Sequence, residues 1–339
     1  MSKIIFSIIL SGHSSLQKLG NKLPETTDIE SRVKKVKRFL DSKYTDYKTY
    51  FLPLITPFLR GLASKGELVI AIDGSDVGKG CTALMVSVVW RKRALPICWL
   101  VRKCKKGHLP VSAHLEVLSQ LLGLVPTGCR VILLGDGEFD SIEQQAFCKL
   151  HDWQYVVRTS KDTLIQTGDG EQFQLNRLRV SNSKEALFIG DVYLTAKKYG
   201  LVNCWVAYNK KEKTSMYWVT NLEYGPDVIT YYKKRFGIET IFGDMKSRGF
   251  NIHKTRVEDA NRIDKLLIII GIAFLIVFAF GTFEKQIKPY LGLILRKDRV
   301  DSYSTFQIGL RSMQFWIENH LKLFKKFRKN FTKYICVRQ

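Results

Sequence analysis

The chain has 339 residues, and 45% of them are hydrophobic, which is enough to bury a sizeable core and excludes an intrinsically disordered tail. It carries 54 Lys and Arg against 31 Asp and Glu, a formal net charge of +23. This excess is far larger than solubility requires, so it indicates a polyanionic partner.

Basic residues recur along the whole sequence, with runs at residues 32–38, 91–93, 102–106 and 322–329. Any one run is usually a solvated face, but four separate runs favour an extended phosphate-binding surface over a single basic arm. Seven cysteines are scattered, odd in number and without a Cys-x-x-Cys pair, which is typical of reduced thiols in a cytosol. The histidines are isolated, so bound zinc is disfavoured.

Residues 1–65 are expected to form a small, mostly helical N-terminal region. An apolar-periodic stretch at 50–62 carries the helical pattern, although Pro53 and Pro57 interrupt it. Residues 4–10 are apolar, but the stretch is short and no small-residue cleavage site follows it. A signal peptide is therefore disfavoured.

Residues 66–160 have the pattern of an α/β domain, with β-branched runs that predict strands and helical periodicity between the later ones. The expected elements are strands at 68–73, 82–90 and 94–101, a helix at 112–122, a strand at 130–134, a helix at 141–150 and a strand at 153–159. Three antiparallel strands followed by helix, strand, helix and strand is the order of a ribonuclease H-like α/β fold, a mixed five-stranded sheet with flanking helices.

The rest of the chain divides into three regions. Residues 161–228 are expected to form a β-rich insertion, with strands at 186–196, 201–208 and 215–222. No proline occurs between Pro226 and Pro289, so helices are expected to complete the core across 229–283. Residues 284–339 are expected to form a helical, basic C-terminal region that binds DNA or serves dimer contacts.

An apolar stretch at 266–280 raises the question of a membrane span. At about 1.5 Å per residue it would cover about 22 Å, which is less than the roughly 30 Å of a bilayer's hydrocarbon core. We therefore expect a buried core helix and no membrane association.

Two aspartates end apolar strands. Asp73 ends the first predicted strand, and Asp136 follows the fourth. A carboxylate at the end of a buried strand costs desolvation unless it is paired or binds a cation, so two such ends on neighbouring strands favour a metal site. Taken singly, each could instead form a cap or an Asx turn, and Asp76 and Asp140 fit that interpretation better.

A third carboxylate lies in the helical region after the insertion. At about 100° per residue, one stripe of an α-helix would carry Tyr232, Arg235, Glu239 and Lys246. A carboxylate flanked by donors that grip phosphates suits a phosphodiester enzyme. An amphipathic helix with solvated Lys and Arg has the same pattern, and periodicity alone favours neither interpretation.

The spacing of these four residues matches the Tyr-Arg-Glu-Lys signature of the IS-four family of insertion-sequence transposases. The chain resembles that family over roughly residues 30–285, including the two aspartates, the β insertion and the apolar helix. The resemblance implies a ribonuclease H-like catalytic core that acts on double-stranded DNA, namely transposon ends and target. It also implies two Mg²⁺ ions, for which Mn²⁺ can substitute.

The resemblance assigns roles residue by residue. The catalytic residues, which would hold the two metal ions, are Asp73, Asp136 and Glu239. The DNA-binding residues, which would hold phosphates of the terminal strand near the cut, are Tyr232, Arg235 and Lys246. A homodimer on two DNA ends and a cytoplasmic, nucleoid-associated location in a prokaryote follow from the same resemblance.

One position departs from the family pattern. In relatives a tryptophan four residues before a strand threonine acts as a wedge for a flipped base, and the matching position before Thr220 is Met216. Trp218 lies on the same strand face, but a core aromatic is the better interpretation. Whether a DNA hairpin intermediate forms is left open.

Two function hypotheses follow. The first is an active DNA transposase that cuts element ends and joins them to target DNA, with residues 1–65 binding DNA. The second is a catalytically inactive DNA-binding remnant of a mobile element. The intact acidic triad favours the first, whereas residues 1–30 are short for a complete end-binding domain and leave the second open. The glycine-rich stretch 74–80 is one residue short of a P-loop, so ATP binding is not expected.

Overall fold

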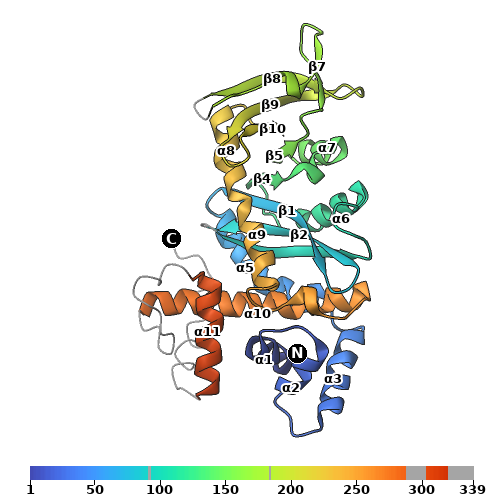
Figure 1. Cartoon of the computed structure of the whole chain (residues 1–339), viewed down its shortest axis with the longest axis vertical. Coiled ribbons are helices and arrows are strands. Elements are labelled where there is room, and N and C mark those ends of the chain that lie inside the picture. Colours follow the sequence, from blue (N-terminus) through green and yellow to red (C-terminus); the bar gives the residue numbers. More distant parts are fainter. Residues whose placement is uncertain (91–92, 183–184, 288–302, 320–339) are drawn as a thin grey trace.

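Ten strands form one mixed sheet in the part of the chain that the structure describes (Figure 1). The computed structural model describes residues 1–90, 93–182, 185–287 and 303–319. The strands are β1 (Glu67–Val77), β2 (Cys81–Trp90), β3 (Arg93–Arg102), β4 (Arg130–Gly135), β5 (Gln154–Thr159), β6 (Leu164–Gln166), β7 (Gln172–Gln174), β8 (Ala186–Leu194), β9 (Tyr199–Asn209) and β10 (Thr214–Thr220). The α-helices are α1 (Ser2–Ser11), α2 (Leu16–Lys22), α3 (Ile29–Asp41), α4 (Tyr47–Tyr50), α5 (Leu52–Ala63), α6 (Val111–Leu122), α7 (Ile142–Leu150), α8 (Gly225–Lys234), α9 (Phe236–Met245), α10 (Ala260–Ile287) and α11 (Thr305–Glu318).

The first five strands have the order β3-β2-β1-β4-β5. Strands β1, β2 and β3 pair antiparallel, whereas β4 pairs parallel to both β1 and β5. Parallel neighbours need a crossover connection, and α6 and α7 provide the two crossovers. This arrangement confirms the predicted α/β fold class with a ribonuclease H-like core.

The five-stranded core sheet is confirmed, and the β-rich insertion extends it beyond β5. Strand β10 pairs antiparallel with the outer edge of β5, and β9, β8, β6 and β7 follow in that order. An unpaired edge exposes backbone donors and acceptors, and the insertion satisfies those of β5. The fold therefore connects the insertion rigidly to the core strands.

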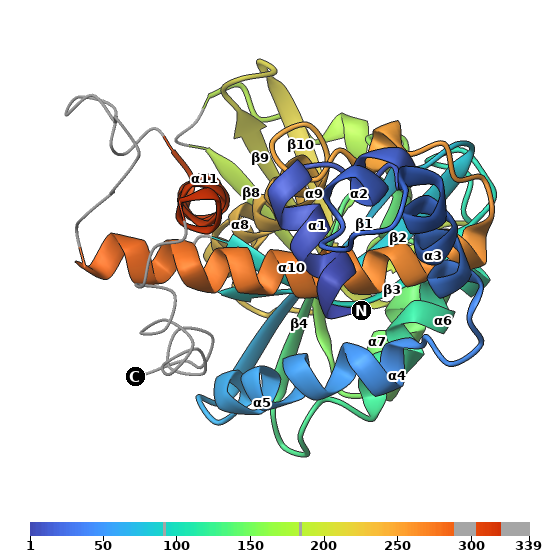
Figure 2. The same cartoon turned by 90° about the horizontal axis from the view of Figure 1, so that it is seen from below.

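Helix α10 lies between the sheet and helices α1–α3, as both views show (Figures 1 and 2). It has 28 residues and is long and apolar enough to cross a membrane by length and composition, so the length argument against a span was wrong. However, 89% of its most apolar window is buried inside the protein. The expected core helix is confirmed by burial, because it fills the space between the sheet and the N-terminal helices.

Helix α11 packs against the C-terminal half of α10 and covers a buried carboxylate there. Glu284 of α10 has no exposed surface. Burial raises its pKa to about 7, although the Trp316 and Ser312 side chains of α11 partly oppose this. The basic run at 322–329 and the end of the C-terminal region lie outside the described residues.

Glu284 makes the stability of the protein dependent on pH. The pKa of Glu284 is raised in the folded protein. The protonated side chain therefore contributes its full stabilisation below the unfolded-state pKa of 4.5, and this stabilisation is lost as the pH rises through about 7. We expect the free energy of unfolding to fall by about 2–3 kcal/mol between about pH 5 and pH 8, and Glu284→Gln to remove most of that fall. Urea denaturation at both pH values measures it, and an equal fall in both proteins would contradict the assignment.

Candidate active site

Asp73 lies within β1 rather than at its end, which corrects the expected strand boundary. Strand β1 continues to Val77 because it keeps its pairing with β2, where Asp73 lies opposite Met85. The parallel pairing with β4 stops earlier, at Ala71 opposite Leu134. Asp73 therefore projects just past the end of β4, and it is only 3% exposed.

Asp136 follows directly after β4 and begins a short 3₁₀ turn, Gly137–Phe139. Its carboxylate accepts a hydrogen bond from the backbone N–H of Glu138 at 3.0 Å. The turn is tight, because a Cβ atom at Gly135 would lie 2.7 Å from the Cβ of Phe139. The two aspartates thus reach the same edge of the sheet from neighbouring parallel strands, as the sequence predicted.

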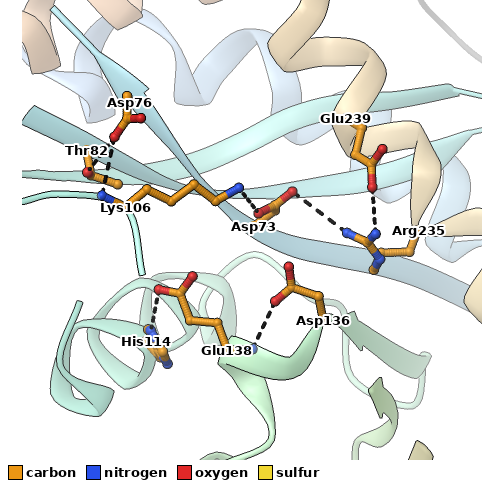
Figure 3. Close-up of polar contacts among 9 residues, drawn as sticks. All are labelled: Asp73, Asp76, Thr82, Lys106, His114, Asp136, Glu138, Arg235 and Glu239. Carbon is orange, nitrogen blue, oxygen red and sulfur yellow. Dashed lines mark hydrogen bonds and ion pairs between the residues drawn. The ribbon is translucent and has the colours of Figure 1, made fainter. Parts of the chain in front are cut away.

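Two cations face the buried Asp73 carboxylate (Figure 3). Lys106 Nζ lies 3.4 Å from Asp73 Oδ1, and Arg235 Nη1 lies 3.7 Å from Asp73 Oδ2. Burial raises the pKa of Asp73, and the nearby Asp136 acts in the same direction, while the two cations lower it. The net direction is upward, so the ionised carboxylate is held at a cost in folding free energy.

Arg235 connects Asp73 to Glu239 (Figure 3). Its Nη2 donates to Glu239 Oε1 at 2.6 Å, and the arginine is only 7% exposed, whereas the Glu239 side chain is about half exposed. Burial opposes the charge of Arg235, but Tyr232, Glu239 and the aspartates outweigh it and raise the pKa of the guanidinium. The charged Arg235 therefore joins two of the three predicted catalytic acids.

Tyr232 supports Arg235 from behind. The Tyr232 ring lies 5.5 Å from the guanidinium carbon and makes an edge-to-face contact with Trp218 at 5.3 Å between ring centroids. Trp218 is 3% exposed, so the interpretation of this residue as a core aromatic is confirmed.

The signature residues do not lie on one continuous helix, which corrects the predicted stripe. Helix α8 ends and helix α9 begins on either side of Arg235. The two helices pack against different strands, α8 against β5 and α9 against β1 and β3. Helix α9 then ends at Met245, and Lys246 has a non-helical backbone. Beyond Met245 the chain turns back, and the backbone N–H groups of Arg248 and Phe250 donate to Gly243 O at 3.0 Å and to Asp244 O at 3.2 Å, which closes the end of the helix.

Lys246 nevertheless stays on the acidic side of the sheet. Burial lowers its pKa, and the negative charges of Asp76 and Asp73 oppose that effect. Asp76 is also not a turn residue as predicted. It belongs to β1, and its Oδ1 accepts hydrogen bonds from Thr82 Oγ1 at 3.4 Å and from the backbone N–H of Lys106 at 3.3 Å. It thereby fixes the loop that carries Lys106.

Sequence reasoning missed two side chains at this centre, Lys106 and Glu138. Lys106 belongs to the basic run at 102–106, which gave no sign that one of its members turns inward. Glu138 follows Asp136 by two residues, and its Oε1 is buried without a hydrogen-bond partner. Burial, with Asp136 next in importance, raises the pKa of Glu138. In the sequence, the only signal that pointed to Glu138 was its position two residues after Asp136.

An open cavity of about 660 Å³ adjoins Asp136. It runs between the turn after β4 and strands β5 and β10, and Arg158, Lys161 and Met216 are among its lining residues. Met216, which occupies the position of the family's wedge tryptophan, therefore lines the space next to a predicted catalytic acid.

The side chains fit a divalent cation by their chemistry, although they are not arranged as a ligand set. Across the described residues, no group of three or more His, Cys, Asp or Glu lies close enough to hold a metal ion. The predicted ligands Asp73, Asp136 and Glu239 offer only carboxylate oxygens, which Mg²⁺ prefers, and the Glu138 carboxylate lies near that of Asp136. In this structure Arg235 and Lys106 supply the positive charge that such acids need.

Comparison with known proteins gives one family match. Residues 64–276, well over half of the chain, match the family described as Transposase DDE domain. Among solved structures, the chain is similar to the piggyBac transposase synaptic complex with hairpin DNA, with a TM-score of 0.46 and 12% identity over 99% of this chain and 75% of that chain. It is also similar to human ENDOV, with a TM-score of 0.30 and 14% identity over 62% of this chain and 93% of that chain. No curated protein has a matching sequence.

Asp73→Asn is expected to stabilise the protein in EDTA. The substitution removes a buried charge whose pKa is raised, so the free energy of unfolding at neutral pH should increase by about 1 kcal/mol. The exposed control Asp162→Asn should change it by less than about 0.5 kcal/mol. Chemical denaturation measures both, and a clear loss of stability in Asp73→Asn would show that the ion pairs with Lys106 and Arg235 outweigh desolvation.

Proposed function

Because the chain belongs to the Transposase DDE domain family, we propose that it is a metal-dependent DNA transposase of the Tyr-Arg-Glu-Lys subgroup. It cleaves the ends of an insertion sequence and joins them to target DNA by phosphodiester hydrolysis and transesterification. One observation carries the proposal: Asp73 of β1 and Glu239 of α9 both pair with Arg235, at 3.7 Å and 2.6 Å, and Asp136 follows the neighbouring strand β4.

Asp73, Asp136 and Glu239 are the proposed catalytic acids, and they would hold the metal ions. When bound, two Mg²⁺ ions, or Mn²⁺ in their place, supply an activated water or 3′-hydroxyl and stabilise the leaving oxygen. Asp73 comes from a paired core strand and Asp136 from a tight turn, so their backbones are held firmly. Glu239 is half exposed and paired with Arg235, so it is the acid with the most freedom to move.

The cations around these acids would grip DNA phosphates. Arg235 presents a planar guanidinium that can bind two phosphate oxygens at once, and Tyr232 packs against it and holds its orientation. Lys106 and Lys246 add positive charge beside Asp73 and Asp76. Each cation would stabilise the charge that grows on the phosphate during cleavage.

The substrate is proposed to be double-stranded DNA, bound by a homodimer that holds two element ends. The net charge of +23 supports an extended contact with the phosphate backbone. The cavity beside Asp136, with Arg158 and Lys161 on its wall, offers space for a strand near the acids. A cytoplasmic, nucleoid-associated location in a prokaryote belongs to the same proposal.

Asp136→Asn is expected to abolish Mg²⁺-dependent nicking of a labelled duplex that carries the DNA flanking this reading frame. Loss of one metal-binding carboxylate should slow cleavage on the order of 10³-fold, because several kcal/mol of transition-state stabilisation disappear. DNA binding, measured by mobility shift, should stay within a few fold of wild type. EDTA should abolish cleavage by the wild-type protein.

The matched control is Asp264→Asn, which alters a half-buried carboxylate on α10. The asparagine oxygen can still accept the hydrogen bond that Trp99 donates to Asp264. It should cleave like wild type. Cleavage by Asp136→Asn at the wild-type rate would remove Asp136 from the mechanism. DNA binding without any cleavage by wild type would instead identify an inactive remnant.

Lys106→Met tests the inward-facing lysine. Because its ammonium lies beside Asp73, we expect cleavage to slow by about 10–100-fold with a much smaller loss of DNA affinity. Lys105→Met is the control, since Lys105 is exposed in the same loop and forms no ion pair within the described residues, so it should weaken DNA binding without a specific effect on single-turnover cleavage. Equal effects of the two variants on both measurements would mean that Lys106 only contributes surface charge.

A further inference from the structure

Glu138 shares the tight turn of Asp136 but has no role in the function proposed above. Its backbone N–H donates to the Asp136 carboxylate at 3.0 Å, so the two residues hold each other in place. Both side chains rise from this turn toward β1 (Figure 3). The Glu138 carboxylate therefore lies beside Asp136 at the end of β4, on the side of the sheet that α6 covers.

The two oxygens of Glu138 have different surroundings. A Cβ atom at Gly74, the residue after Asp73, would lie 4.0 Å from Glu138 Oε2, so this oxygen reaches the strand that carries the first catalytic acid. Oε1 points away from that strand, is buried, and has no hydrogen-bond partner. Buried carboxylate oxygens are nearly always hydrogen-bonded, so an orphan at this place requires an explanation.

His114 of α6 lies behind Glu138. Its side chain is 2% exposed, and neither ring nitrogen has a hydrogen-bond partner. Nε2 is 3.9 Å from Glu138 Oε1, and the imidazole packs against the ring of Phe139 at 4.8 Å between centroids. A buried imidazole without a partner is thus aimed at a carboxylate without a partner, a little beyond hydrogen-bond distance.

A purely structural pair would not be built in this way. Two polar groups buried for stability alone would be at hydrogen-bond distance, and apolar residues of the same size would serve the core equally well. In metal centres, a residue behind a carboxylate ligand commonly orients that ligand toward the metal ion. His114 lies behind the Glu138 carboxylate in this way. A cation on the Oε2 side would give the Glu138 charge a partner.

We propose that Glu138 is a fourth carboxylate of the metal centre and that His114 is its positioning residue. This inference rests on the metal-dependent function proposed above. The turn after β4 would then supply two carboxylates to the metal centre, those of Asp136 and Glu138. Glu138 would provide an oxygen donor in addition to the half-exposed Glu239.

The test is Mn²⁺ binding to the full chain without DNA. Binding is measured as the loss of the paramagnetic resonance signal of free Mn²⁺. Glu138→Gln should weaken Mn²⁺ binding by about 10–100-fold. Glu143→Gln is the matched control, since Glu143 is an exposed acid five residues along, paired with Lys197, and should bind Mn²⁺ like wild type. Asp136→Asn reports on the proposed function itself.

The outcomes separate the two ideas. Wild-type affinity in Glu138→Gln together with weak binding in Asp136→Asn would overturn the role of Glu138 and leave the proposed function standing. No Mn²⁺ binding by wild type, or unchanged binding in Asp136→Asn, would overturn the proposed metal centre and the fourth carboxylate with it. Thermal unfolding of each variant verifies that the fold is kept.

The role of His114 has its own test. His114→Gln keeps a donor near Nε2, whereas His114→Phe keeps the packing against Phe139 and removes both nitrogens. A positioning role predicts Mn²⁺ affinity within about threefold of wild type for Gln and a loss of about tenfold for Phe. Wild-type affinity in His114→Phe would reduce His114 to a core residue. If the Phe variant does not fold, His114→Met supplies the same comparison.

Discussion

The burial of a negative charge at Asp73 is the constraint on which the rest of the site depends. Strand β1 runs past the end of β4 and places this carboxylate in a nearly solvent-free position. Such a charge must be balanced by cations. Arg235 and Lys106 offset part of this cost, and each comes from a different segment, the junction of α8 and α9 and the loop after β3. The need to balance one charge thus fixes where two distant segments lie.

The insertion takes part in this arrangement, because β10 adds to the edge of β5 and brings Trp218 against Tyr232. Tyr232 in turn packs against Arg235, which reaches Asp73. A continuous line of contacts therefore runs from the inserted strands to Asp73, the first proposed catalytic acid. A change in the insertion would be felt at the acids through aromatic packing and not through a charge.

Local sequence patterns predicted the strands, the helices and the order of the ribonuclease H-like core, because hydrophobic periodicity and turn residues act over short distances. They failed where tertiary contacts decide. Helix α9 ends at Met245 in a turn whose backbone N–H groups donate to Gly243 O and Asp244 O, contacts that no periodicity encodes. Lys106 turns inward because Asp76 holds its backbone, and only the folded sheet brings these two residues together. The assigned roles of Asp73, Asp136 and Glu239 stay predictions.

The same cations that pair with the acids are the groups that we propose to bind DNA. Arg235 cannot lose its proton, so a metal ion that takes over the carboxylates leaves the guanidinium with an unbalanced charge in a site with little water. A phosphate is the partner that would restore the balance, and the half-exposed Lys106 adds a second cation beside Asp73. Metal binding and phosphate binding are then coupled by charge exchange. The positive charge needed in the transition state is already in place and requires little reorganisation.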